Sequence, residues 1–413
     1  MQLTLMTIVF IIFLGLQELK AQVQNRAIDS NRSAETKDAT EIREEYYRSD
    51  WKKVEIDFLN SYYSQDGNNG AVTGGIGTER LTDFTQKVMI SIPTSPKLRL
   101  NLDGAYDYYS SASTDNIDNI RSSDSSSDLR AQFGAGLQYM ASEQVTTGFR
   151  LGTSVEYDYF SIHAGGNVSI TSKNGNRRLD IATQAFYDQW ILFFPKELRG
   201  KVEVPTDRRQ SYNAALSYHQ VLNRRMQLSL MVEGTYMQGL LSTPFHRVYF
   251  RDQTQPDIER LPDTRLKIPL GLRWNYYISD RFILRSYYRY YWDSWGMTGH
   301  TASIELPIKV NRFFAVYPHY RYHQQSAVDH FLPYKEHSVD SQFYTSDFDL
   351  SALSSHTFGG GILYSKSGGI ASMKIPLVNR KLTLETIDLK GSIYMRSTGL
   401  KGFIVSVGTK VSF

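Results

Sequence analysis

The sequence predicts an all-β protein, a transmembrane antiparallel up-and-down β-barrel of about sixteen strands. Three observations predict it: apolar and polar residues alternate with a period of two over long segments, the connections between these segments alternate in length, and the chain ends on an aromatic residue. The composition agrees, because 28 Tyr and 21 Phe stand against 12 Pro in 413 residues. Tyr is favoured in strands and at membrane interfaces.

The alternating segments are long. Leu98, Leu100 and Leu102 lead into Tyr106 and Tyr108 with mainly polar residues between them, and residues 266–276 and 282–293 show the same period. Each segment suffices for a tilted strand of about 9–11 residues, which crosses about 25 Å of hydrocarbon. Strands of a soluble sandwich also alternate, but they average only about 5–6 residues. The length therefore favours a membrane barrel.

The connections alternate between short turns and longer links. Short turns are predicted at 95–97, 142–144, 173–176, 223–225, 279–281, 311–312 and near 366–369, and mostly longer links at 66–81, 114–127, 192–208, 242–263 and 327–353. Short periplasmic turns opposite long outer loops are typical of bacterial outer-membrane barrels. An even strand number also returns both termini to the periplasm.

Three parts are expected along the chain. Residues 1–21 are predicted to be a signal peptide, because the apolar run 5–16 is shorter than the about 20 residues of a membrane-spanning helix and Ala21 offers a cleavage site. A buried core helix is the alternative. Residues 22–52 are a polar periplasmic leader, with a small plug or a partner-binding peptide as alternatives, and residues 53–413 are the barrel. The expected location is the cell outer membrane of a Gram-negative bacterium.

The last strand carries an expected assembly signal. Phe403, Val411 and Phe413 share one face of the final alternating segment. A strand that ends in a C-terminal Phe looks like the signal read by the machinery that inserts outer-membrane barrels. That machinery and the outer-membrane lipid are therefore expected partners.

Several classes of protein are disfavoured by composition. The chain has no cysteine and a formal net charge of +4. Disulfides, thiolate nucleophiles, iron–sulfur clusters and cysteine zinc sites are excluded, and a nucleic-acid partner is not expected without a large clustered basic surplus. No cofactor is predicted.

Five segments together resemble a known family. They are GTERLTDFT at 77–85, YSSASTDNI at 109–117, SVEYDYFS at 154–161, RSYYRYYWDSWGMTGHTASIELP at 285–307 and FYTSDFDLSALSSHTFGGG at 343–361. Over the whole mature chain the sequence resembles a family of uncharacterised outer-membrane β-barrels, found in Bacteroidota and some Proteobacteria and catalogued as of unknown function. The resemblance implies the fold and location, and it transfers no activity or site residue. It also implies gene neighbours for flavin transfer and a thioredoxin-like lipoprotein, and so a redox-linked assembly, although the sequence shows neither flavin nor haem chemistry.

Charged residues are expected on the inner face of consecutive strands. They are Arg265, Lys267, Arg273, Arg285, Arg289, Asp293, Glu305, Lys309, His319, Arg321 and His323. Acidic residues at the other end of the sequence, such as Asp103 and Asp107, should face them after closure. The charges either pair and brace the lumen, since buried charges must be paired, or form a basic wall that orients anions or docks a charged partner.

Aromatic residues are expected at the outer ends of their strands, on the lipid-facing side. They are Tyr276, Tyr288, Tyr290, Trp292, Tyr320 and Tyr322. Rings of this kind form the aromatic girdle at the boundary between headgroups and hydrocarbon. A platform for stacking carbohydrates is the alternative.

The long loop at about 327–351 carries weak candidates for a metal site. Asp340, Asp347 and Asp349 could bind calcium, which takes 6–8 oxygen ligands, but the twelve-residue calcium-loop pattern is absent. The aromatic content of the loop favours a constriction or cover over the barrel mouth. Ser354, Ser355 and His356, and the pair Asp329 and His330, supply catalytic residue types without a diagnostic spacing, so no enzyme is predicted.

The sequence thus favours a pore for small polar or charged solutes. The alternative is a structural sheath or scaffold of a complex between periplasm and surface, with a periplasmic partner docked through residues 22–52. A barrel hydrolase is the third hypothesis.

Overall fold

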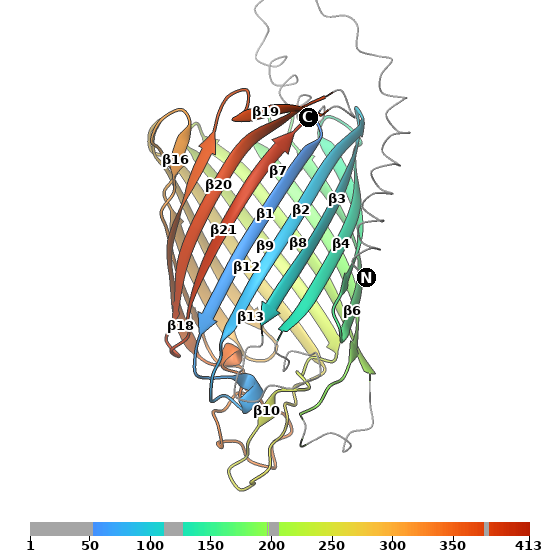
Figure 1. Ribbon diagram of the computed structural model, residues 1–413, viewed down its shortest axis with the longest axis vertical. Helices are drawn as coiled ribbons and strands as arrows, with labels where there is room; N and C mark the ends of the chain where they lie inside the picture. Colours follow the sequence, from blue (N-terminus) through green and yellow to red (C-terminus); the bar gives the residue numbers. More distant parts are fainter. Residues whose placement is uncertain (1–52, 111–126, 196, 198–205, 376–379) are drawn as a thin grey trace, which may run out of the picture.

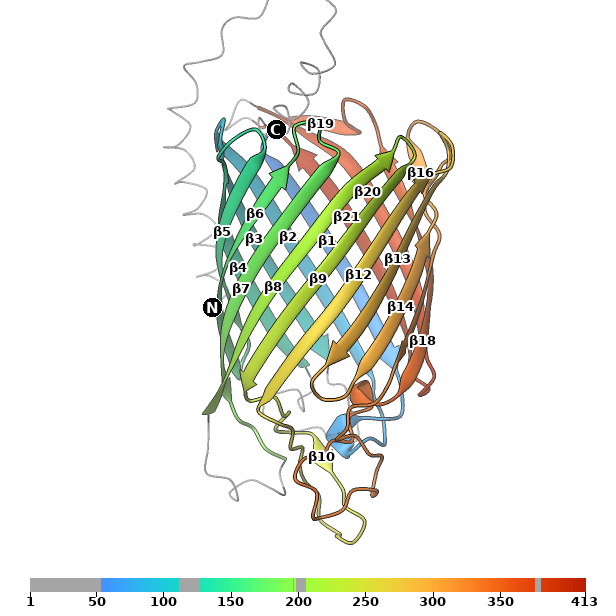
Figure 2. The same cartoon turned by 180° about the vertical axis from the view of Figure 1, so that it is seen from behind.

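The computed structural model describes residues 53–110, 127–195, 197, 206–375 and 380–413. In these residues an antiparallel sheet closes on itself, because β1 (Glu55–Asp66) pairs with β2 (Leu81–Ser95) on one side and with the last strand, β21 (Lys401–Ser412), on the other. Figure 1 shows β1 and β21 side by side, and Figure 2 shows the opposite wall. The predicted signal peptide 1–21 and leader 22–52 lie outside the described residues.

The barrel has sixteen strands, which confirms the predicted fold class. The sheet contains nineteen strand segments. β14 and β15 together make one barrel strand, and β16 and β17 make another. β19 is a short segment that pairs only with the first residues of β20 and is not counted as a separate barrel strand. The remaining segments are β3 (Leu98–Ser110), β4 (Ser127–Met140), β5 (Val145–Val155), β6 (Tyr159–Thr171), β7 (Arg177–Ile191), β8 (Thr206–Asn223), β9 (Met226–Gly239), β12 (Thr264–Tyr277), β13 (Ile283–Asp293), β14 (Thr298–Glu305), β15 (Ile308–Lys309), β16 (Phe314–Val316), β17 (His319–Gln325), β18 (Leu353–Ser365), β19 (Ala371–Ile375) and β20 (Arg380–Arg396).

Two neighbouring barrel strands are interrupted where prolines fall. Pro307 separates β14 from β15, and Pro318 separates β16 from β17. Proline has no backbone N–H and therefore removes one ladder hydrogen bond. The two breaks lie beside each other, since the Leu306 amide donates to the Pro318 carbonyl at 3.0 Å. The barrel wall continues across them.

The two ends of the barrel differ. β1 begins and β21 finishes at the same end of the barrel, because Glu55 lies opposite Ser412. At this end, tight turns join β2 to β3, β4 to β5, β6 to β7, β8 to β9 and β12 to β13. The link from β18 to β20 at this end is longer than predicted and carries β19. At the other end, here named the loop end, lie the long links 67–80, 240–263 and 326–352 and three short links at 156–158, 294–297 and 397–400. The predicted link 114–127 lies almost wholly outside the described residues.

The barrel wall has two chemically different faces. Along β8, Tyr212 and Leu216 are 48% and 42% exposed, whereas Ser211, on the opposite face, is 8% exposed. Phe133 of β4 is 45% exposed, and its neighbour Gln132 donates to Asp107 inside the barrel at 3.4 Å. Large apolar side chains therefore cover the exterior, far beyond the patches that water-soluble monomers normally expose.

The long links of the loop end pack into a cap, here called the loop cap and defined as residues 67–80, 240–263, 294–297 and 326–352. Two apolar clusters hold it together: Leu261, Trp295, Met297 and Val328 form one, and Val248, Phe250 and Tyr344 form the other. The short strands β10 (Arg247–Val248) and β11 (Asp257–Ile258) and the 3-10 turns η3 (Ala71–Thr73) and η5 (Phe348–Leu350) lie in it. No helix in the described ranges is long and apolar enough to span a bilayer.

The two-faced wall predicts opposite responses to one inserted charge at adjacent positions of β4. Phe133→Arg places a guanidinium on the apolar exterior and should lower the free energy of unfolding by roughly 2–4 kcal/mol when a bilayer surrounds the barrel. Gln132→Arg places the same group beside Asp107 and should leave stability nearly unchanged. Urea unfolding in lipid vesicles measures both, and equal losses would show that β4 is not two-sided.

Candidate functional site

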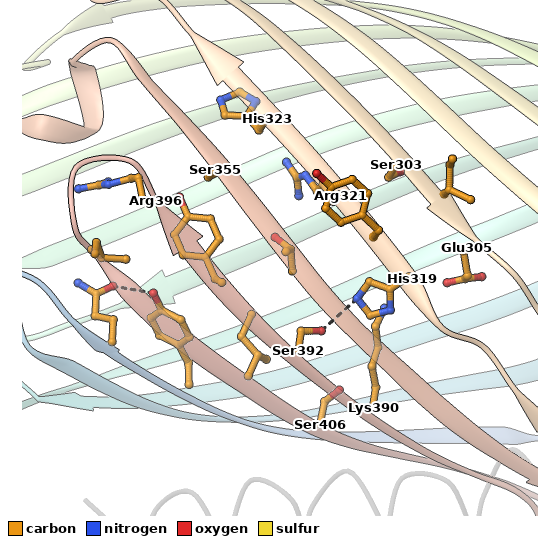
Figure 3. Close-up of a pocket in the computed structure, with 18 of the residues that line it drawn as sticks. Ser303, Glu305, His319, Arg321, His323, Ser355, Lys390, Ser392, Arg396 and Ser406 are labelled. Atoms are coloured by element: carbon orange, nitrogen blue, oxygen red, sulfur yellow. Dashed lines mark hydrogen bonds between the residues drawn. The ribbon is translucent and has the colours of Figure 1, made fainter.

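A cavity of about 770 Å³ lies against the inner wall formed mainly by β14, β17, β18, β20 and β21. Of the predicted inner-face charges, four line it: Glu305, His319, Arg321 and His323. Figure 3 shows these side chains together with Lys390 and Arg396 of β20, which the sequence analysis did not single out. The cavity is thus the place where the barrel gathers titratable groups from several strands.

Two cations in the cavity lack an acidic partner. Neither Arg321 of β17 nor Lys390 of β20 forms an ion pair within the part of the chain that the structure describes. Hydroxyl groups surround them, from Ser303, Ser355, Thr357, Ser392 and Ser406. Unpaired cations flanked by hydroxyl donors form an environment that attracts anions.

The acidic residues of the cavity are partly neutralised. At the loop end, the Arg396 guanidinium pairs with Asp349 and lies 3.5 Å from Glu79. Burial raises the pKa of the Glu79 carboxyl to about 7, and Arg396 opposes this shift. Near neutral pH, Glu79 is therefore protonated in part of the molecules and carries less than a full negative charge. Glu305, the third carboxylate of the lining, pairs with Arg285, so each carboxylate of the cavity has a cationic partner.

The other predicted inner-face charges are mostly engaged with partners. Arg285 pairs with Glu305 at 2.8 Å, Arg289 lies 3.8 Å from Glu233, and Arg273 lies 5.6 Å from the centre of the Tyr287 ring. Arg265 pairs with Asp293. Lys267 lies opposite Asp293 in the neighbouring strand, and Lys309 lies in β15 beside a turn. Most of the predicted inner-face charges on this wall therefore have a partner, whereas Arg321 and Lys390 have no ion-pair partner among the described residues.

A glycine in the middle one of three strands allows side chains of the two outer strands to contact each other. Arg150 of β5 pairs with Asp103 of β3 at 2.6 Å, and the bridge passes over Gly134 of the intervening β4, where an added Cβ would lie 2.6–2.7 Å from both groups. In the cavity wall, His319 and Ser392 meet at 3.1 Å across Gly359 in the same way. Both bridges require a residue without a side chain between them.

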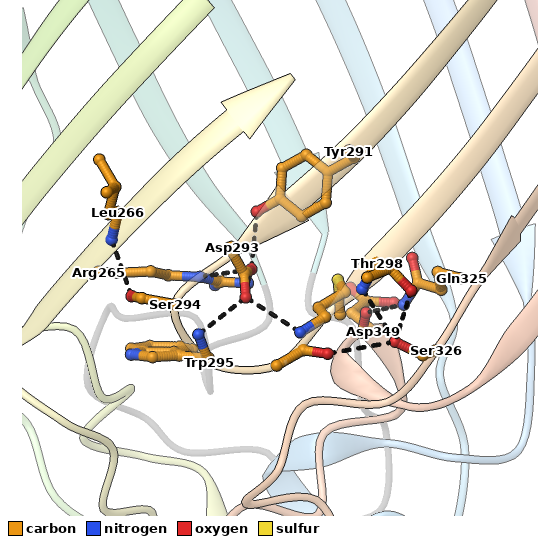
Figure 4. Close-up of polar contacts among 12 residues, drawn as sticks. Arg265, Leu266, Tyr291, Asp293, Ser294, Trp295, Thr298, Gln325, Ser326 and Asp349 are labelled. Atoms are coloured by element: carbon orange, nitrogen blue, oxygen red, sulfur yellow. Dashed lines mark hydrogen bonds and ion pairs between the residues drawn. The ribbon is translucent and has the colours of Figure 1, made fainter. Parts of the chain in front are cut away.

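Asp293 fastens the loop cap to the barrel, as Figure 4 shows. Its carboxylate is fully buried and accepts hydrogen bonds from the Trp295 and Met297 amides, at 2.9 and 3.1 Å, and from the Tyr291 hydroxyl at 2.8 Å. The Arg265 guanidinium pairs with it and lies 4.1 Å from the centre of the Trp295 ring. Asp293, predicted as a lumen charge, thus joins the loop cap to the barrel wall at the loop end, and is here called the latch.

The predicted aromatic girdle is divided between the two ends. Tyr288, Tyr290 and Trp292 approach the loop end of β13, and Tyr320 and Tyr322 lie in β17, which ends at the same side. The expected position of Tyr276 is wrong, because β12 runs from the loop end to the tight turn and Tyr276 lies beside that turn, opposite Leu284. Two of these hydroxyls contact outer-face histidines: Tyr288 contacts His300 at 2.7 Å and Tyr320 contacts His356 at 2.8 Å.

The Ser and His residues considered for catalysis do not meet. Ser355 lines the cavity, whereas His356 lies on the opposite face of β18 against Tyr320. A Ser–His–Asp contact does exist elsewhere: His219 Nδ1 lies 2.7 Å from the Ser229 hydroxyl, and its Nε2 lies 3.3 Å from Asp180. Ser229 is only 4% exposed, however, and Arg178 donates to both Asp180 oxygens at 2.9 Å. This contact links β7, β8 and β9.

The three weak metal candidates do not form one site. Asp349 pairs with Arg396, while the Asp340 amide donates to Ser338 elsewhere in the loop. Asp347 instead meets His246 and Glu259 in the loop cap. Burial raises the pKa of the Asp347 carboxyl to about 6, and His246 opposes the shift.

The residues of the expected assembly signal lie along the closing seam. Phe403 is 45% exposed and its ring centre lies 5.6 Å from that of Tyr62 in β1. Val411 pairs with Ile56, and Phe413 exchanges two backbone hydrogen bonds of 3.0 Å with Val54. The C-terminal residue therefore takes part in closing the barrel.

Comparison with known proteins relates the chain to one family and to several solved structures. A family model described as "Protein of unknown function (DUF3570)" matches residues 103–370. No curated protein matches the chain. Solved structures similar in shape include the siderophore receptor PirA of Pseudomonas aeruginosa (10% identity, TM-score 0.41, 87% of this chain and 80% of the receptor) and a bacterial polysaccharide outer membrane secretin (10%, 0.47, 87% and 98%). The Pseudomonas aeruginosa protein OccK1 is another (8%, 0.41, 87% and 98%). Likeness at this level concerns barrel shape and says nothing of substrates.

The burial of Asp293 predicts a large cost for its removal. Asp293→Ala leaves the Arg265 charge unpaired in a buried site and should lower the free energy of unfolding by about 3–5 kcal/mol. Glu305→Ala breaks the more exposed pair with Arg285 and should cost only about 0–1 kcal/mol. Denaturant unfolding of both variants in the same detergent gives the comparison. Similar losses for the two would mean that Asp293 is not the latch described.

Proposed function

We propose that this chain, which belongs to the DUF3570 family, is an outer-membrane barrel that forms a passive pore and prefers small anions. The observation that carries the proposal is the pair of free cations, Arg321 and Lys390, on the cavity wall. Fixed charges along a pore wall set its ion selectivity. The hydroxyl groups beside them would stabilise an oxyanion as it passes.

The apolar exterior supports the membrane location. The wall strands β1 to β9 have 11–18 residues, enough to cross the hydrocarbon core when tilted. Outward residues such as Phe149, Leu151 and Ile162 are 55%, 53% and 48% exposed in the isolated chain. Lipid is the solvent that makes this exposure favourable, because burial of apolar surface is worth about 25 cal/mol per Å².

We place the tight-turn end in the periplasm and the loop cap at the cell surface. The described chain begins and finishes at the tight-turn end, which agrees with a periplasmic leader at 22–52 after removal of residues 1–21. The seam position of Phe413 supports its role as a signal for the barrel-insertion machinery. Both assignments follow the usual polarity of bacterial barrels.

The loop cap favours a second candidate, a barrel that is closed at the surface and sheathes a larger envelope assembly. The cap has its own apolar clusters and is fastened by Asp293 and Arg396. Such a barrel would conduct little on its own and would bind a periplasmic partner through residues 22–52. Conductance therefore separates the two candidates.

The pore predicts a measurable anion preference. Purified protein in a planar bilayer with a salt gradient should give a reversal potential that favours anions, and Arg321→Glu with Lys390→Glu should shift it toward cations. The shift should shrink from 0.1 M to 1 M salt, because the Debye length falls from about 10 Å to about 3 Å.

The control carries the same change in net charge outside the cavity. Arg224→Glu with Arg225→Glu alters the exposed turn between β8 and β9 and should leave selectivity close to that of the unmodified protein. No conductance from well-folded protein would refute the pore and favour the sheath. Conductance with unaltered selectivity in the Arg321 and Lys390 variant would refute the anion wall.

A further inference from the structure

Three side chains from separate parts of the loop cap converge away from the cavity. His246 directly precedes β10, Glu259 directly follows β11, and Asp347 caps the 3-10 turn η5. Their donor atoms all lie within 4.8 Å of one another. His246 and Glu259 of one link and Asp347 of a link much later in the sequence thus present one imidazole and two carboxylates to the same point.

The spacing is too wide for hydrogen bonds. His246 Nδ1 lies 3.7 Å from Glu259 Oε1 and 3.9 Å from Asp347 Oδ2, whereas an N–H···O bond spans about 2.7–3.2 Å. Nδ1 is buried and has no hydrogen-bond partner. An unsatisfied buried nitrogen costs about 1–3 kcal/mol, and Nδ1 faces the two carboxylates with no hydrogen bond to either of them.

Hydrogen bonds from neighbouring residues hold both carboxylates in place. Glu259 is 4% exposed and accepts from the Thr243 amide at 2.7 Å and the Thr345 hydroxyl at 2.5 Å. Asp347 uses its other oxygen to accept from the Asp349 amide at 2.9 Å. The hairpin also fixes His246 and Glu259 relative to each other, since the Glu259 amide donates to the His246 carbonyl at 2.9 Å. Supports of this kind orient metal ligands in known sites.

We propose that His246, Glu259 and Asp347 bind one divalent transition-metal ion of the zinc class. Such ions take imidazole and carboxylate ligands at about 2.0–2.2 Å, and two ligands of a tetrahedral ion are then about 3.4 Å apart. The distances from the imidazole to the two carboxylates, 3.7 and 3.9 Å, exceed this value by a few tenths of an ångström, and all three ligand atoms lie within 4.8 Å of one another. Calcium fits less well, because it prefers 6–8 oxygen ligands.

The bound ion would tie together the two longest links of the loop cap. His246 and Glu259 belong to the link 240–263, and Asp347 belongs to the link 326–352. A divalent charge would also compensate two carboxylates that the fold withdraws from water. The site would therefore add a metal cross-link to the apolar clusters that hold the cap together.

Zinc titration of the full-length protein tests the proposal. Chelator-treated protein in detergent should bind one Zn²⁺ per chain in competition with a chromophoric chelator, and Co²⁺ should give a visible absorption band from a site of low coordination number. His246→Gln and Asp347→Asn keep side-chain volume and should each weaken Zn²⁺ binding by at least about tenfold. Gel migration with and without heating reports whether each variant is folded.

Two further variants separate this site from other sources of binding. His330→Ala removes an imidazole of the same cap whose ring centre lies 5.3 Å from that of Phe343, and it should leave the affinity unchanged. Asp158→Asn disrupts a separate acidic cluster of Asp128, Glu156 and Asp158 and should also leave it unchanged. The proposal is overturned if folded protein binds no stoichiometric Zn²⁺, if binding survives both ligand variants, or if Asp158→Asn abolishes it.

Discussion

The pairing of β1 with β21 is the constraint on which the rest of the structure depends. Twelve residue pairs, from Glu55 with Ser412 to Asp66 with Lys401, join the first strand of the sheet to the last. An open sheet would leave a row of unpaired N–H and C=O groups, which are costly in hydrocarbon. Closure removes that edge and at the same time separates an inside from an outside. Every later property, from the apolar exterior to the charged cavity, follows from which side of this closed wall a residue occupies.

The face that a residue occupies could be predicted for much of the wall, because side chains alternate along a strand with a period of two. Alternation in 285–293 places Arg285 and Arg289 on one face and Tyr288 and Trp292 on the other. The contacts agree, since Arg285 pairs with Glu305 and Arg289 lies 3.8 Å from Glu233, whereas Tyr288 contacts His300 on the outer face. The same rule would have found Lys390, since Leu389 and Ile393 are 47% and 57% exposed on the other face of β20. The position of Tyr276 was missed although the predicted short turn at 279–281 follows it directly, because the alternation used to place it gives a face but no direction along the barrel. Direction requires the order of turns and loops.

The partners of the charges were harder to predict. The pairing of Arg285 with Glu305 can be predicted from strand register, because the two residues lie directly opposite each other on strands joined by one short link. Arg150 with Asp103 spans a strand and depends on Gly134, and His246 with Asp347 depends on how two long links pack. Loops lack a fixed period, so a sequence pattern gives their residue types without their contacts. The loop cap is therefore where structure adds most, in the Asp293 latch and in the cluster at His246.

The central claim is that one wall separates an apolar solvent from an aqueous interior. Because the chain contains no cysteine, single cysteines at 212–217 of β8 can each carry one nitroxide spin label in lipid vesicles. For a two-faced wall, we expect that labels at 212, 214 and 216 collide mainly with dissolved oxygen, and that labels at 213, 215 and 217 collide mainly with a water-soluble nickel chelate. Uniform collision rates along the six positions would contradict it.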